Sequence, residues 1–380
     1  MRVQRIRDTS NCSFYELVDD TGQPIPVVSQ FLRYIGSRGC SPNTVSAYAY
    51  DLLHFTRFLN AQGWNYDDFT PGRSIRLLEY LHNIQSQRPT RSAGPVLAVS
   101  AGKPVRRLAP ASINRVLAAV SSFYEYLILS EHWKAGPNPM LKKFDSEAAR
   151  VPDRHHPFMG RASRQQPIRR VLRVRTIRRV PRPMDGTQVS QLIEELKLRR
   201  DKVMTLLMLN GGLRPGEVLN LHLEDIQYGR CRIIIRHRTD HPRGVRTKSR
   251  TERIVDLRDN TTLQSLSDYV MNERPKESTT THVFLRGGRG QRRNEPLSYH
   301  ALAKMFERHC TRLGIRAKWV TPHALRHTHA TQMWDGGMRE LALQKRLGHA
   351  SPESTRIYTR VSDSTVVAEY CRALGQKDAK

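Results

Sequence analysis

The stretch from Thr321 to Arg360 carries side chains that could together attack a phosphodiester. His323 and Arg326 lie three residues apart, so on a helix they share a face. Two further candidates, His349 and Tyr358, lie in the second half of the stretch. An arginine that binds phosphate oxygens, two imidazoles that form hydrogen bonds and a tyrosine hydroxyl suit nucleophilic attack on phosphorus.

The composition of the chain favours a polyanionic partner. Its 380 residues carry a formal charge of +28, an excess typical of proteins that bind nucleic acid. No apolar run suggests a membrane span, and the N-terminus has no secretory signal. The five cysteines lie far apart and form no Cys-x-x-Cys pattern, which predicts reduced thiols in a cytosolic protein.

The pattern of helix signals predicts a chain of four parts. Residues 1–26 read as an extended arm, with a β-hairpin turned at Asp20–Gly22. Residues 27–140 contain four amphipathic segments and are predicted to form a helical DNA-binding domain. Residues 141–184 form an arginine-rich linker, and residues 185–380 form a second domain.

The linker is the sharpest break in composition. From Arg154 to Met184 it has no acidic residue. It could be a solvated connection between domains. Alternatively, it could lie along a phosphate backbone, with each arginine replacing a condensed counterion. The charge of the whole chain favours the second interpretation, so we predict DNA contact by Arg169, Arg170, Arg173, Arg175, Arg178 and Arg179.

The second domain combines helices with short β-branched strands. Helices are expected at residues 185–199, 201–210 and 298–314, and a third short strand at residues 283–285. The overall fold class is therefore mainly α with a small antiparallel β-sheet, in which a helical N-terminal domain precedes a mixed α+β domain.

Two polar positions in this domain have both a structural and a functional interpretation. Arg214 lies between the end of one helix and the start of the next, with Glu217 one turn further on to orient its guanidinium. On this pattern alone a structural ion pair is the simpler interpretation. Lys248 lies between predicted strands at residues 231–236 and 251–257, where an isolated lysine is usually solvated.

The order and local strings of these residues resemble one family. GGLRPGEVLNL, TKSRTERIVDL, HALRHTHAT and LGHASPESTRIYTRV resemble the motifs of the tyrosine recombinases, the phage integrase and Xer-like superfamily. The resemblance covers residues 185–374, extends more weakly over 27–140, and favours the transposon-encoded integrases of the superfamily. The chain departs from compact Xer-like proteins by an insertion around residues 236–246. The matching catalytic positions are Arg214, Lys248, His323, Arg326, His349 and Tyr358.

The resemblance implies covalent catalysis by Tyr358. Its hydroxyl would attack phosphorus and leave a 3′-phosphotyrosyl link and a free 5′-hydroxyl. Arg214 and Arg326 would bind the non-bridging oxygens and stabilise the developing charge. Lys248 would protonate the departing 5′-oxygen. Because the guanidiniums take the role of a metal ion, we expect no metal and no cofactor.

The remaining motif residues have supporting roles in this scheme. His323 would hydrogen-bond the phosphate or assist proton transfer from the tyrosine, and His349 would donate to a phosphate oxygen. Glu217 would orient the network. A metal site at His323, His327 and His329 is disfavoured, because no partnering carboxylate follows at metal-site spacing.

The implied partner is double-stranded DNA with specific recombination sites. We expect a dimer on each site and a tetramer when two sites pair, with accessory recombinases as a further possibility and no membrane partner. The expected location is the bacterial cytoplasm, in association with the nucleoid. Two alternatives stay open, namely a type IB topoisomerase-like relaxing enzyme and a catalytically silent DNA-binding factor.

Overall fold

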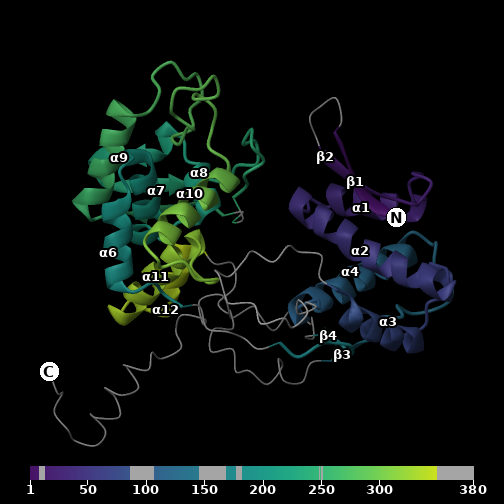
Figure 1. Cartoon of the computed structure of the whole chain (residues 1–380). Helices are drawn as coiled ribbons and strands as arrows, with labels where there is room; N and C mark the ends of the chain where they lie inside the picture. The colour runs from purple at the N-terminus through teal and green to yellow at the C-terminus, as the bar shows by residue number, and fades with distance from the viewer. Residues whose placement is uncertain are drawn as a thin grey trace, which may run out of the picture. The chain divides into compact units, whose positions relative to one another are not determined.

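The computed structural model describes residues 1–7, 13–85, 107–144, 168–176, 182–247, 249 and 251–348. The chain divides into two compact units, Met1–Arg178 and Arg179–Lys380 (Figure 1). Each unit has its own hydrophobic core. The functional assignment of the four predicted parts stays a prediction.

Unit 1 contains the four helices expected from the sequence, each of which begins with a proline. Proline suits this position because its fixed φ matches the helix and its missing N–H would have no partner there. Ser41 and Thr70 cap two of the helices by accepting from backbone N–H groups. The four helices are α1 (Pro26–Ser37), α2 (Pro42–Gln62), α3 (Pro71–Asn83) and α4 (Pro110–Leu129).

Aromatic rings fill the core between these helices. Phe55 lies with its centroid 6.0 Å from that of Tyr124 and 5.0 Å from that of Phe69, in edge-to-face contacts. The hydroxyl of the fully buried Tyr124 donates to the carbonyl of Tyr66 at 2.8 Å. The helical unit is therefore held by ring packing, and the buried hydroxyl of Tyr124 is hydrogen-bonded.

The N-terminal arm forms a β-hairpin, but its reversal differs from the predicted one. β1 (Arg2–Arg7) pairs antiparallel with β2 (Ser13–Val18), and the register joins Arg7 to Ser13. The segment Asp20–Gly22 forms a second reversal, which returns the chain so that Val18 bridges Pro24. Leu17 from β2 is fully buried in the core of unit 1.

Part of the predicted linker packs on unit 1. β3 (Lys142–Phe144) pairs antiparallel with β4 (Ile168–Arg170), and the following residues run along α4. Asn114 of α4 donates to the carbonyl of Val174 at 2.8 Å and accepts from its N–H at 2.9 Å. Leu172 and Val174 also contact the apolar core. Residues 168–176 are therefore a docked element rather than a solvated spacer.

Unit 2 is built around α7 (Arg199–Asn210), which packs against α9 (Asn260–Asn272) and α11 (Pro322–Asp335). The predicted helices within residues 185–199, 201–210 and 298–314 are all present, whereas α9 is a helix that the sequence patterns did not reveal. The other helices of the described part are α6 (Gly186–Glu195), α8 (Pro215–Leu219), α10 (Tyr299–Arg312) and α12 (Glu340–Leu347). Within the described ranges, no helix combines the length and apolarity that a membrane crossing needs.

The sheet of unit 2 is antiparallel, in the order β5-β6-β7. β6 (Arg232–Ile235) and β7 (Arg253–Asp256) are the two predicted strands, and β5 (Ile226–Gln227) is the third. The prediction of a third strand at residues 283–285 is wrong. This buried apolar segment makes an isolated bridge from Leu285 to Pro296 and does not join the sheet. Its continuous apolar run reflects burial on all sides rather than strand pairing.

Candidate active site

The described residues include part of the predicted catalytic set. Arg214, Glu217, His323 and Arg326 are described in unit 2, whereas three other residues lie outside the described residues. Those three are Lys248, His349 and Tyr358. The described end of α12, at Leu347 and Gly348, directly precedes His349. The structure therefore shows the residues that contact the chain immediately before His349.

Arg214 is held rigidly at the start of α8. Its backbone N–H and its Nη1 both donate to the carboxylate of Glu217, each at 2.8 Å. The same guanidinium donates to the carbonyls of Leu347 at 3.4 Å and Gly348 at 3.2 Å. The structure therefore contains the ion pair that the sequence suggested, and adds a link from Arg214 to the end of α12.

Arg326 and His323 lie on α11 in different environments. The side chain of Arg326 is buried, and its two Nη atoms donate to the carbonyls of Gly212 at 2.6 Å and Leu347 at 2.7 Å. Its guanidinium is also 3.8 Å from the carboxylate of Glu217. His323, in the first turn of α11, is exposed. The helical spacing predicted a shared face, but the two side chains differ sharply in access to solvent.

Arg253 on β7 completes the cluster, and the sequence analysis did not single it out. Its Nη1 and Nη2 donate to Glu217 at 2.9 and 2.7 Å, and its Nε donates to the carbonyl of Arg346 at 2.9 Å. A signal was present in the strand pattern. The buried face of β7 is set by Val255 and, just after the strand, by the buried Leu257. Arg253 has the same parity, so its side chain points inward and needs a carboxylate partner.

Glu217 is the centre of this arginine cluster, which we define as Arg214, Arg253 and Arg326 around Glu217. Burial alone would raise the pKa of Glu217, but the hydrogen bonds and charge of Arg253, with the charges of Arg326 and Arg214, lower it to about 2. The carboxylate is therefore ionised at neutral pH. Three guanidiniums against one carboxylate leave an excess of positive charge, which suits a bound phosphate.

The C-terminal end of α12 is fixed by the arginine cluster. The carbonyls of Arg346, Leu347 and Gly348 all accept from cluster guanidiniums. Gly348 has φ +64°, and a Cβ there would lie 2.8 Å from Nη1 of Arg253, so only glycine fits without displacement. The segment that carries His349 therefore leaves α12 from a point that the cluster determines.

A second network supports the same helix end from α11. Burial and the charge of Arg346 lower the pKa of His329 to about 4, so its imidazole is neutral at pH 7. Nε of Arg346 donates to Nε2 of His329 at 3.0 Å, and its Nη2 donates to the carbonyl of Asn210 at 3.0 Å. His329 thus uses its ring to position Arg346. Among the residues that the structure describes, no group of three metal-binding side chains is placed to hold an ion.

The predicted linker arginines lie in unit 1, apart from two that fall outside the described residues. Arg169, Arg170, Arg173 and Arg175 belong to the docked segment 168–176. The two outside the described residues are Arg178 and Arg179. Their role in DNA contact stays a prediction.

Comparison with known proteins identifies the family. The phage integrase family matches residues 182–365, and the phage integrase N-terminal SAM-like domain matches residues 28–131. Transposase A from transposon Tn554 of Staphylococcus aureus is 30% identical over 383 residues, which cover 100% of both chains. The chain belongs to the phage integrase family. As a member it is a tyrosine recombinase, an enzyme that cleaves and rejoins DNA.

A further relative agrees with this phage integrase assignment, and two solved structures share the fold of the chain. Tyrosine recombinase XerD of Staphylococcus saprophyticus is 26% identical over 358 residues, covering 90% of this chain and 97% of XerD. The Tn1549 transposon integrase in complex with transposon right end DNA has a TM-score of 0.58 at 16% identity, covering 91% of this chain and 98% of the integrase. The XerH recombinase bound to palindromic difH substrate also gives 0.58 at 16% identity, with coverage of 86% and 79%. The predicted fold class is confirmed.

Proposed function

We propose that this tyrosine recombinase is a site-specific recombinase of a mobile element, with Tyr358 as its nucleophile. The tyrosine oxygen forms a bond to phosphorus while the bond from phosphorus to the 5′-oxygen breaks. Lys248 gives a proton to that oxygen, and His323 assists removal of the tyrosine proton. Attack by the 5′-hydroxyl of a partner strand then reverses the step and releases Tyr358.

The guanidiniums and His349 have an electrostatic role in this proposal. Arg214 and Arg326 donate to non-bridging oxygens as charge develops on the phosphorane, and His349 donates to a phosphate oxygen. In the structure, part of this donor capacity is directed to the carbonyls of Leu347 and Gly348. Binding of DNA would therefore exchange carbonyl acceptors for phosphate oxygens, with Glu217 and Arg253 keeping the guanidiniums in place.

One observation carries the proposal more than any other. The arginine cluster, whose members come from α8, β7 and α11, holds the carbonyls directly before His349. A purely structural ion-pair network has no need to combine an excess of guanidiniums with the start of the segment that contains Tyr358. A network that binds a phosphate beside a tyrosine needs both.

The partners and the division of labour follow from the same proposal. We assign residues 27–140 to core-site binding, with residues 1–26 as an arm, and residues 185–380 to catalysis, with arginines of residues 141–184 on the DNA backbone. The substrate is double-stranded DNA with specific sites, bound by a dimer that pairs into a tetramer. Full-length similarity to transposase A from transposon Tn554 supports integration, excision or transposition as the biological reaction. The bacterial nucleoid, within the cytoplasm, is the corresponding location.

The test is covalent trapping on DNA that carries the ends of the element. The full chain and a Tyr358→Phe variant are incubated with this DNA in EDTA, and adducts are separated on denaturing gels and mapped to a peptide. We expect an adduct at Tyr358 that is absent from the variant and independent of metal ions. An adduct that survives in Tyr358→Phe would disprove the assignment of the nucleophile. Relaxation of supercoils without joining of two sites would instead favour the topoisomerase-like alternative, and tight binding without any adduct would favour a silent DNA-binding factor.

A further inference from the structure

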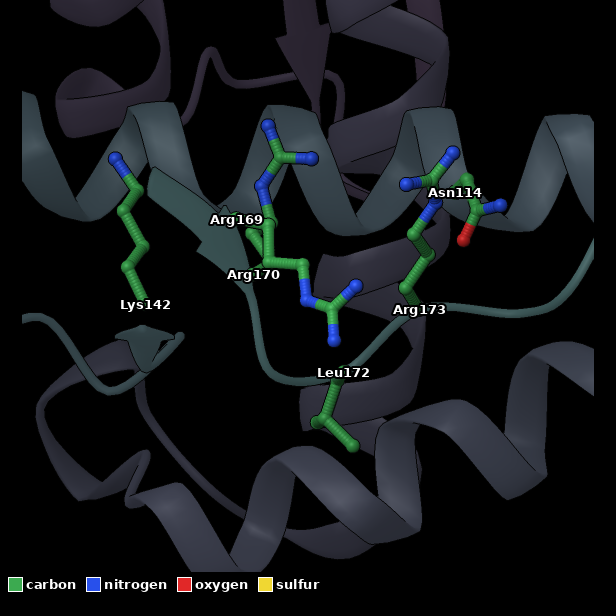
Figure 2. A pocket seen from close by; sticks show the side chains of 6 residues that line it. All are labelled: Asn114, Lys142, Arg169, Arg170, Leu172 and Arg173. Atoms are coloured by element: carbon green, nitrogen blue, oxygen red, sulfur yellow. The ribbon is translucent and has the colours of Figure 1, made fainter. Parts of the chain in front are cut away.

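Unit 1 contains a pocket of about 460 Å³ whose lining is mostly cationic (Figure 2). It lies where the β3–β4 pair and the docked segment 168–176 meet α4. Four of its six lining residues carry a positive charge, and none carries a negative charge. The lining residues are Asn114, Lys142, Arg169, Arg170, Leu172 and Arg173.

The strand register places like charges directly opposite one another. Lys142 pairs with Arg170, and Lys143 pairs with Arg169. Like charges at opposite positions of an antiparallel pair destabilise it. Lys142 is compensated by an ion pair with Glu125. Arg170 is different, because its Nε is buried and has no hydrogen-bond acceptor among the described residues.

The backbone around the pocket is fixed before any ligand binds. The paired hydrogen bonds between Asn114 and Val174 hold the segment on α4, and Leu172 packs against the core. The backbone N–H of Val171 extends the β3–β4 ladder by donating to the carbonyl of Leu141 at 2.9 Å. A site whose backbone is already ordered loses less conformational entropy on binding, so it binds more tightly than the same arginines on a flexible chain.

We propose that this pocket binds one phosphate group of the DNA backbone at a distance from the bond that is cut. The inference rests on the proposed function, and it replaces the general attraction of an arginine-rich linker with a single built site. Guanidiniums present planar pairs of N–H donors that match phosphate oxygens, and Nε of Arg170 is the donor that lacks an acceptor. A phosphate on the docked segment would set the position of unit 1 along the duplex without reading its sequence.

The experiment compares Arg170→Gln with Lys143→Gln in the full chain. Both substitutions remove one positive charge from the β3–β4 pair, but Lys143 does not line the pocket. Fluorescence anisotropy measures the affinity for a random-sequence duplex over a range of salt concentrations. Loss of one phosphate contact lowers the slope of log K against log salt by about 0.9, so we expect this change in Arg170→Gln and a much smaller one in Lys143→Gln. Equal slopes in the two variants would overturn the proposal.

Three further measurements separate the possible causes of such a change. Arg170→Gln relieves the repulsion with Lys142, so its Tm in the absence of DNA should equal or exceed that of the parent; a lower Tm would overturn the assignment by showing a structural role. Titration with inorganic phosphate separates the two sources of the anion. Phosphate binding that Arg170→Gln abolishes, with an unchanged DNA slope, would refute the DNA assignment. Adduct formation by the parent chain at saturating protein is the control for the proposed function, and its absence would indicate failure of that function instead.

Discussion

Replacement of Arg253 by methionine is the most direct test of the arginine cluster. The substitution keeps an unbranched apolar side chain but removes both hydrogen bonds to Glu217 and the one to the carbonyl of Arg346. Removal of one partner from a buried ion pair costs about 3–5 kcal/mol. Because Arg214 and Arg326 still face Glu217, we expect the lower end, about 3 kcal/mol.

This loss is measurable as a shift in the thermal transition of unit 2. For a unit of this size, a change of 1 kcal/mol moves Tm by roughly 2–4 °C, so we expect a decrease of about 6–12 °C. The matched control is Arg312→Met, which breaks an ion pair with Glu195 at an exposed position of the same unit. Screening by water makes that pair contribute little. Equal Tm values for the two variants would refute the reasoning.

Arg253→Lys separates stability from positioning. A lysine keeps the charge beside Glu217 but lacks the planar fork that also reaches the carbonyl of Arg346. We expect Tm to recover most of the loss, while single-turnover adduct formation at saturating DNA stays reduced by up to about tenfold, the effect of one hydrogen bond. A lysine variant with full cleavage would show that Arg253 stabilises the fold without positioning the end of α12.

Three other predictions follow from neighbouring features. Gly348→Ala places a Cβ against the arginine cluster at φ +64°, a backbone conformation that costs about 1–2 kcal/mol for an L-residue. We therefore expect adduct formation to fall while DNA binding persists. Unchanged single-turnover cleavage would contradict this prediction. Glu217→Gln should destabilise unit 2 far more than Asp51→Asn destabilises unit 1. The pKa of Glu217 is lowered to about 2, whereas burial raises the pKa of Asp51 despite its arginine partner. The urea midpoints of the two variants, each compared with the parent chain, test this difference. Burial lowers the pKa of His241 and His282 to about 4, below the unfolded value of 6.5. The unfolded chain therefore binds more protons between these values, and the urea midpoint of unit 2 should fall as pH decreases from 6.5 towards 4; a constant midpoint would be evidence against buried neutral imidazoles.

Local patterns in the sequence determined most of the helices and the order of the candidate residues. Proline at the first helical position and serine or threonine caps act within one turn, so they can be read without knowledge of the fold. The helix α9 escaped detection because Asn260–Asn272 is rich in residues of weak helix propensity. The residue type at its N-cap is a common one, and in the structure the side chain of Asp259 accepts from the N–H of Thr262 at 3.1 Å.

The tertiary structure alone decided how the candidate site is assembled. Arg214 and Glu217 are close in sequence, so their pairing could be proposed from spacing. Arg253 and Arg326 reach the same carboxylate from a strand and a helix far along the chain, and no local pattern specifies which buried charges will meet. The docked segment 168–176 is a second example. Its arginine-rich composition is typical of a linker, and only the hydrogen bonds between Asn114 and the backbone of Val174 show that it is fixed on α4. Sequence periodicity records which side chains must be buried, whereas the choice of partner depends on the packing of elements that are distant in the chain.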